Sequence, residues 1–107
     1  MGEKKVVEIV KELRKFKRRV KNALGVDEII LFGSAAKGTL RKDGDVDLII
    51  VSKRFERKHF VDRGVKLYDY WHLPYPVDFI CLSPKEFERM KKEVSIINEA
   101  LKHGIRV

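Results

Sequence analysis

Apolar positions recur at helical spacing through the first quarter of the chain. Over residues 4–24 they stand three or four apart, which is the period of an amphipathic helix, and Gly25 follows as a natural helix end. The apolar positions are Val6, Ile9, Val10, Leu13, Phe16, Val20 and Leu24. The pattern predicts one long helix with a single apolar face against a core.

Three short apolar runs have the length and composition of β-strands. They cover residues 27–33, 46–52 and 77–82. The second run is apolar on both faces after its first aspartate, which is typical of a central strand. Residues 105–107 form either a short tail or an edge strand.

The segments between these runs predict helices of unequal length. Residues 34–37 have room for one helical turn before Gly38. Residues 55–71 carry apolar and aromatic side chains at roughly helical spacing, although Gly64 interrupts the pattern. We therefore expect a short turn of helix after the first strand and a longer helix after the second.

The clearest helix start in the sequence follows the third strand. Ser83 is suited to the N-cap, Pro84 to the first helical position, and Glu86 to closing a capping box. This helix is expected to continue, with or without a break near Glu93, to His103. The order of elements predicts an α/β (α+β) fold, in which a small mixed β-sheet of three to four strands is flanked by helices and residues 1–107 form a single domain.

The composition says more about where the protein works than about the reaction it performs. The formal net charge of +8 could attract nucleic acid, nucleotide phosphates or an acidic protein. Much of the excess positive charge lies in residues 11–21, however, and a solvated helix face is the simpler interpretation of that segment. The single cysteine, Cys81, excludes an intramolecular disulfide and a cysteine-based zinc site. No apolar run approaches the roughly 20 residues of a membrane span, and no signal-peptide pattern opens the chain. We expect a cytoplasmic protein that does not associate with membranes.

The stretch "LFGSAAKGTLRKDGDVDLIIV", residues 31–51, resembles two phosphate or metal motifs only in part. Gly33 and Gly38 have P-loop spacing, but Thr39 stands where the phosphate-binding lysine is needed. The alternating aspartates imitate an EF-hand loop, but Leu48 replaces its bend glycine and Arg54 its closing glutamate. Both interpretations are rejected.

A different constellation remains. Gly33 and Ser34 end a strand and open a helical turn, where backbone N–H groups can hold phosphate oxygens. Asp45 and Asp47 stand two apart at the start of the next strand, so they are expected on one face and could flank a divalent cation, or two cations about 4 Å apart. Asp78 is isolated in an apolar strand; if this strand lies beside that of Asp47, it can complete a Mg²⁺ site.

Gly33-Ser34, ten residues, Asp45-x-Asp47 and then Asp78 resemble the nucleotidyltransferases of the DNA polymerase β superfamily, in particular the stand-alone minimal nucleotidyltransferases of archaea and bacteria. The resemblance implies the nucleotidyltransferase fold. It also implies that Asp45 and Asp47 hold two Mg²⁺ ions, that Asp78 ligates the ion at the attacking oxygen, and that Gly33-Ser34 binds the triphosphate of ATP. An acceptor hydroxyl would then attack the α-phosphate in line and release pyrophosphate.

One departure concerns the triphosphate. The family often reads G-S-R-A-R-G, whereas this chain has Ala35 and Lys37 at the arginine positions. Lys37, Arg41 or Lys42 could supply the positive charge. Asp43 fits the turn before the strand and is given no ligand role.

The resemblance also suggests which molecule accepts the nucleotide. Minimal nucleotidyltransferases typically pair with a HEPN-domain protein, often an RNase toxin, and transfer AMP onto one of its tyrosines, as in type VII-like toxin–antitoxin pairs. Two alternatives stay open. The chain could be a catalytically weak antitoxin that acts by complex formation, or it could transfer nucleotides to RNA or to a small molecule.

Overall fold

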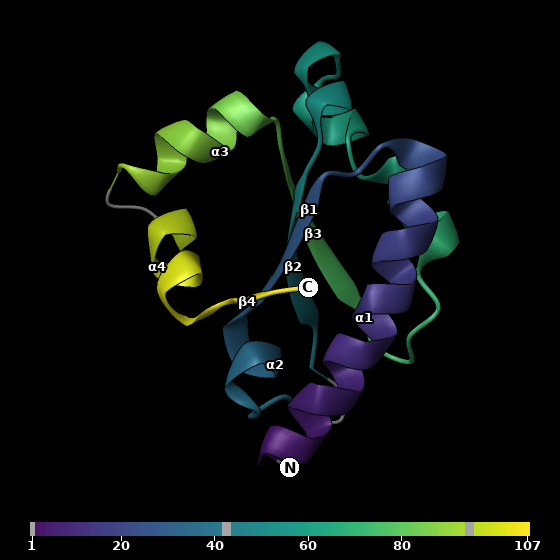
Figure 1. Cartoon of the computed structure of the whole chain (residues 1–107), viewed down its shortest axis with the longest axis vertical. Coiled ribbons are helices and arrows are strands. Elements are labelled where there is room, and N and C mark those ends of the chain that lie inside the picture. The colour runs from purple at the N-terminus through teal and green to yellow at the C-terminus, as the bar shows by residue number, and fades with distance from the viewer. Residues whose placement is uncertain (1, 42–43, 94–95) are drawn as a thin grey trace.

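The computed structural model describes residues 2–41, 44–93 and 96–107 of the chain (Figure 1). Lys42 and Asp43, which figure in the sequence predictions, lie outside these ranges. The elements in chain order are α1 (Gly2–Leu24), β1 (Glu28–Phe32), α2 (Gly33–Lys37), β2 (Val46–Val51), the 3₁₀ turns η1 (Lys53–Arg57), η2 (Phe60–Asp62) and η3 (Val65–Tyr70), β3 (Val77–Leu82), α3 (Pro84–Lys91), α4 (Ile96–His103) and β4 (Ile105–Arg106).

The four strands form one mixed sheet in the order β3-β2-β1-β4. β1 is antiparallel to both β2 and β4, whereas β2 and β3 are parallel. The predicted α/β fold and the central position of β2 are confirmed. The C-terminal segment is an edge strand, because Ile30 and Leu31 of β1 pair with its two residues.

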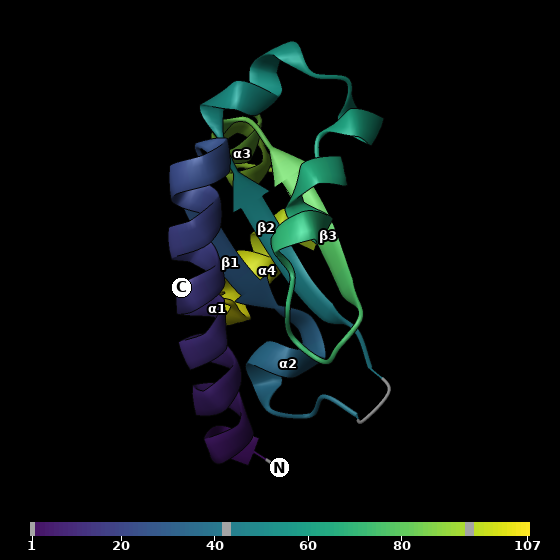
Figure 2. The same cartoon turned by 90° about the vertical axis from the view of Figure 1, so that its right-hand side faces the viewer.

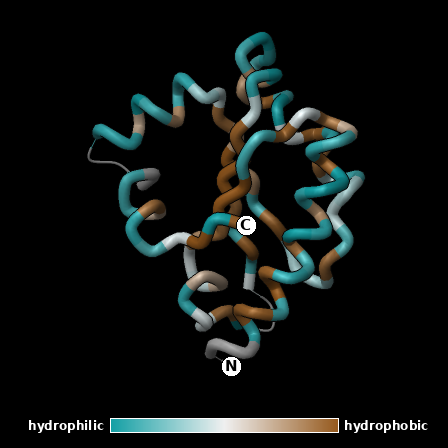
Figure 3. Tube along the Cα trace, in the orientation of Figure 1, coloured by the Kyte–Doolittle hydropathy of each residue, from teal (hydrophilic) through white to brown (hydrophobic). Residues whose placement is uncertain are grey.

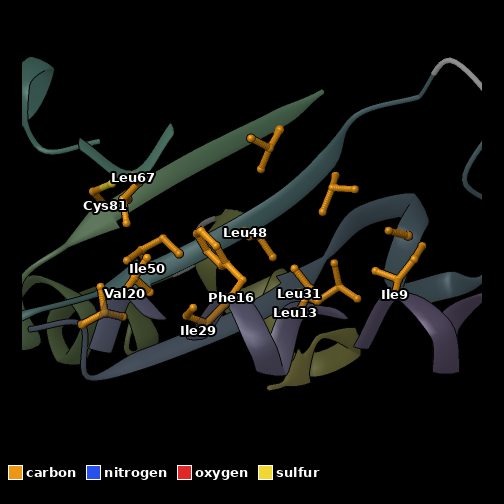
Figure 4. Packing of buried hydrophobic residues seen from close by; sticks show 14 of the residues in the cluster. Ile9, Leu13, Phe16, Val20, Ile29, Leu31, Leu48, Ile50, Leu67 and Cys81 are labelled. Atoms are coloured by element: carbon orange, nitrogen blue, oxygen red, sulfur yellow. The ribbon is translucent and has the colours of Figure 1, made fainter. Parts of the chain in front are cut away.

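Helices cover both faces of the sheet. α1 runs along one face and α3 and α4 lie against the other, as Figures 1 and 2 show. The apolar stripe predicted for α1 is the buried one: Ile9, Leu13, Phe16 and Val20 pack on alternate residues of β1 and β2 (Figure 4). Brown, hydrophobic residues follow the strands in Figure 3, while the helices are largely teal on the outside. The sheet therefore forms the centre of the core.

A second, smaller core lies under α3 and α4. Ile30, Ile49 and Val51 of the sheet contact Phe87 of α3 and Ala100 of α4. These strand residues alternate with those that face α1, which explains why β2 is apolar on both faces. The same alternation decides which face of the sheet receives each aspartate.

The prediction of one helix over residues 55–71 is wrong, because the segment forms the three separate 3₁₀ turns η1, η2 and η3. Lys58 is extended and ends the first turn. Only Phe55 and Leu67 of these turns are buried, and Phe60 and Val61 are exposed. Because the apolar side chains do not share one face against the core, nothing stabilises a continuous α-helix here.

The C-terminal helical region matches its prediction closely. Ser83 caps α3, and Glu86 closes the capping box on the backbone N–H of Ser83. α3 ends at Lys91, so the helix does break near Glu93. Asn98 of α4 donates a hydrogen bond to the Lys91 carbonyl over 2.8 Å, which satisfies an end carbonyl that the helix leaves open.

Candidate active site

Gly33 joins β1 to α2 in a conformation that only glycine adopts easily. Its φ is +72°, and a Cβ added there would lie 2.5 Å from Oδ2 of Asp47. The backbone of the β1–α2 turn therefore touches one of the candidate ligands directly. The absent side chain leaves the space beside that carboxylate free.

α2 is a single short turn, as predicted, and Gly38 ends it at φ +75°. Its N-cap position is Phe32, which provides no side-chain hydrogen bond to the open N–H groups of the first turn. Ser34 lies inside the turn, and its carbonyl accepts hydrogen bonds from both the backbone N–H (2.9 Å) and the hydroxyl of Thr39. Within the described residues, the Ser34 hydroxyl makes no hydrogen bond and remains open to a ligand.

Two of the candidate carboxylates are brought together by strand register. β2 and β3 pair so that Asp47 lies directly beside Asp78. Register partners in a sheet project to the same face, so both side chains lie on the face that α3 and α4 cover. Asp45 precedes the first residue of β2, Val46, and is exposed rather than part of the strand.

The electrostatics of Asp47 indicate that the three carboxylates are close. Partial burial raises the pKa of Asp47, and the nearby carboxylates of Asp78 and Asp45 raise it further. Within residues 2–41, 44–93 and 96–107, however, no three His, Cys, Asp or Glu side chains are already arranged as a metal-binding group. Carboxylate oxygens are the donors that Mg²⁺ prefers, and a bound cation would relieve this repulsion, so the donor set fits that ion.

A pocket of about 260 Å³ opens beside Gly33. It lies between the end of β1, α2 and α4, and its other lining residues are Phe32, Lys37, Glu99, Ala100 and His103. Lys37 thus lies where a triphosphate at Gly33 could reach it. The sequence analysis did not predict that α4 lines this pocket. Glu99 and His103 belong to no recognisable motif, and only tertiary packing places them beside Gly33.

The remaining residues of the glycine-rich stretch are less suited to hold phosphate. Ala35 is buried, with 1% of its surface exposed, so this position presents no charge where the family often has arginine. Arg41 is exposed. Lys37 is therefore the described cation that lines the pocket at Gly33.

Cys81 takes no part in this site. It belongs to the core under α1, whereas Asp78, three residues earlier on the same strand, faces the other side of the sheet. Burial raises the pKa of the thiol to about 11, although the charge of Arg63 partly opposes the shift. The protonated thiol is a core side chain and not a nucleophile.

Comparison with known proteins identifies the family. Residues 13–107 match the model of the nucleotidyltransferase domain family, so the chain belongs to that family. A Methanocaldococcus jannaschii protein whose name reads "Putative protein adenylyltransferase" is 29% identical over 103 residues, which cover 94% of this chain and 100% of that protein.

A solved structure gives the same fold. The crystal structure of "a putative nucleotidyltransferase" from Sulfolobus solfataricus superposes with a TM-score of 0.67 at 20% identity, and the match covers 96% of this chain and 82% of that one. At this identity the likeness concerns the fold alone. Within the part of the chain that the structure describes, no helix is both long enough and apolar enough to cross a membrane.

Proposed function

We propose that this protein transfers AMP from ATP to a hydroxyl group of another protein. The observation that carries the proposal is the pairing of Asp47 with Asp78 across β2 and β3, next to the side-chain-free turn at Gly33. Membership of the nucleotidyltransferase domain family supports the reaction type. The name of the M. jannaschii relative supports AMP as the group transferred and a protein as the acceptor.

Each candidate residue has a role in this scheme. Asp45, Asp47 and Asp78 would hold two Mg²⁺ ions, which neutralise phosphate charge and lower the pKa of the acceptor hydroxyl when bound. The Gly33 turn lets the triphosphate approach the backbone, the Ser34 hydroxyl donates a hydrogen bond to a phosphate oxygen, and Lys37 adds positive charge.

The chemical step is a substitution at phosphorus. The acceptor oxygen forms a bond to the α-phosphorus while the bond to the bridging oxygen of pyrophosphate breaks. By the family resemblance, Asp78 would ligate the ion at the attacking oxygen and help to remove the hydroxyl proton. Asp47, Asp78 and the Gly33 turn are held by the sheet, so the scheme depends on positioning more than on movement of the protein.

We further propose that the acceptor is a tyrosine of a HEPN-domain partner and that the chain acts as its antitoxin. The resemblance noted above suggests this partner, and an exposed apolar surface supports a protein rather than a small molecule. Phe60, Val61, Val65 and Tyr68 are each more than half exposed and line a groove of about 170 Å³. Clustered exposed apolar side chains mark protein-binding surfaces.

Intact mass spectrometry tests the transfer. The chain is incubated with ATP, Mg²⁺ and the product of the adjacent gene, and the partner is expected to gain the mass of one AMP. Asp45→Asn and Asp47→Asn should abolish the gain, whereas Glu12→Gln, a change of an exposed carboxylate on α1, should preserve it. Unchanged transfer in both active-site variants would contradict the assignment.

One observation favours a second candidate, an antitoxin that acts by complex formation alone. Because Ala35 is buried, no arginine reaches the triphosphate from this position. In that case the wild-type chain would form a stable complex with the partner without a mass gain, and Asp47→Asn would neutralise the partner as well as wild type does. Transfer to RNA in the absence of any partner would instead favour an RNA substrate.

A further inference from the structure

Four basic side chains line one small pocket at the end of the sheet remote from the candidate carboxylates. The pocket has a volume of about 110 Å³ and is lined by Arg54, Lys58, Arg63 and Lys66 together with apolar residues of α1, η1 and η3. No acidic residue is among its described lining residues. Figure 1 shows the teal turn that follows β2 at the top of the molecule and α2 at the bottom, and the two pockets share no lining residue, so this pocket is separate from the site at Gly33.

Arg63 gives the pocket a fixed, buried cation. Only 9% of its side chain is exposed, and Nη1 lies 2.6 Å from Oε1 of Glu86. Its Nε donates to the carbonyl of Lys58 and its Nη1 to the carbonyl of Cys81, both over 3.2 Å. The guanidinium is therefore held in one orientation, and Glu86 neutralises its charge.

The Arg54 side chain lies against the end of α1. A Cβ on Gly25, whose φ is +70°, would lie 2.6 Å from Nε of Arg54, so the guanidinium lies across the end of α1. The end carbonyls of a helix attract a cation, which explains why Arg54 lies there. Within the described residues, no carboxylate pairs with the Arg54 guanidinium.

For Lys58 and Lys66, no contact within the described residues explains their position at the pocket. Both are exposed, and neither ammonium group makes an ion pair or a hydrogen bond to the described residues. The acidic residues of the same segment, Glu56, Asp62 and Asp69, do not line the pocket. Three basic groups therefore converge on one pocket without a neutralising carboxylate, beside the apolar side chains of Phe55 and Leu67, which lower the local dielectric constant.

We infer that this pocket binds a phosphate group, either free or as part of a nucleotide. Its volume is well below the roughly 300 Å³ at which pockets begin to enclose whole small molecules, so it suits one compact anion. Guanidinium and ammonium groups that converge from several sides match the oxygens of a tetrahedral oxyanion. The site is an addition to the proposed transfer reaction and does not depend on it.

Amide NMR titration of the whole chain tests the inference. Inorganic phosphate, pyrophosphate and AMP are added separately at low salt in the presence of EDTA. We expect saturable shifts at the amides of Lys58 and of residues 63–67, and weaker binding as salt is added, because the contacts are ionic. Equal affinity for phosphate and AMP would identify the free anion as the ligand, whereas tighter binding of AMP would identify the nucleotide.

A double variant and a matched control locate the binding. Lys58→Ala combined with Lys66→Ala should weaken binding by at least about tenfold, because two charge-assisted contacts are lost. Lys53→Ala removes an exposed lysine of the same segment that does not line the pocket, and should leave the affinity unchanged. Neither lysine of the double variant is buried, so the fold should persist and the remaining spectrum should be retained. Shifts confined to residues 33–36, equal affinity in the double variant, or no saturable shift would each overturn the inference.

Discussion

At the scale of single residues, the contact between Gly33 and Asp47 is the tightest constraint in the candidate site. The positive φ and the 2.5 Å distance that would separate a Cβ at this position from the Asp47 carboxylate disfavour other residues for two independent reasons, backbone strain and steric overlap. If the neighbouring atom had no function, it could shift to make room for a larger residue at position 33. Here the neighbouring atom is Oδ2 of Asp47, a proposed metal ligand, so a substitution of Gly33 should affect both stability and activity.

We therefore expect Gly33→Ala to impair both properties. The strained φ should cost about 1–2 kcal/mol of unfolding free energy, and displacement of Asp47 should abolish nucleotide transfer. Gly64→Ala is the matched control for stability, because its φ is ordinary and a Cβ there would lie 3.5 Å from Sγ of Cys81. Urea denaturation and the mass assay measure the two effects, and equal stability of both variants would contradict the constraint.

The thiol of Cys81 gives a second prediction at this scale. Since burial raises its pKa to about 11, the thiol should stay protonated and unreactive at pH 8. Ellman's reagent should label it slowly in the native protein and rapidly in denaturant. Fast native labelling would show that the thiol is accessible and that the core around β3 is looser than described.

At the scale of elements, one ion pair joins the 3₁₀ segment to α3. Glu86 accepts hydrogen bonds from the backbone N–H of Ser83 and from the buried guanidinium of Arg63. A single carboxylate therefore both starts α3 and anchors the turn between η2 and η3. This ion pair helps to hold the 3₁₀ segment against α3, because few apolar side chains of that segment are buried.

Glu86→Ala should accordingly destabilise the protein by about 1–2 kcal/mol, through the lost capping box and the unpaired buried arginine. Glu88→Ala is the control: it removes an exposed glutamate of the same helix whose partner is Lys91, and should change stability little. Urea denaturation at pH 7 measures the difference. Similar losses for both variants would argue against a special role for Glu86.

The same carboxylate predicts a pH dependence. Desolvation raises the pKa of Glu86, but hydrogen bonds from Ser83 and Arg63 outweigh it and leave the pKa below 4.5. The folded state thus binds the proton more weakly than the unfolded state, so this stabilisation is complete above about pH 4.5 and is lost as the pH falls through the lowered pKa. The difference in stability between wild type and Glu86→Gln should shrink as the pH falls below about 4.5, and a difference that stays constant would exclude Glu86 as a source of pH dependence.

At the scale of the whole molecule, the parallel pairing of β2 and β3 unites residues that stand thirty-one positions apart in the chain. Asp47 and Asp78 come from strands that are adjacent in the sheet but separated in sequence by the three 3₁₀ turns. Their shared register places two like charges side by side at the edge of the core. Such an arrangement opposes folding, and proteins keep conflicts of this kind mainly at functional sites.

Asp78→Asn tests this conflict. Without divalent cations the variant should be slightly more stable than wild type, with a rise in melting temperature on the order of one or two degrees, because a repulsion is removed. Nucleotide transfer should be lost at the same time. Circular dichroism should show an unchanged fold, and a large destabilisation would indicate that Asp78 has a structural partner instead.

Much of the fold follows from local signals in the chain. The stripe of Leu13, Phe16 and Val20 specifies α1, the apolar run of β2 specifies a central strand, and the capping box at Ser83 specifies the start of α3. Each signal depends on neighbours within one or two turns, so it needs no knowledge of the tertiary structure. The helix predicted over residues 55–71 failed because its spacing imitates a helix without one buried face.

The sequence by itself determined which residues could form the site: the glycine and serine after a strand, two aspartates two apart, and a third in an apolar strand. Only the tertiary structure decided that Asp47 lies beside Asp78, that Glu99 and His103 close the pocket at Gly33, and that four basic residues of the 3₁₀ segment meet in a second pocket. The physical reason is that residue spacing fixes the face on which a side chain lies, whereas the pairing of strands and the docking of helices depend on the burial of the whole core.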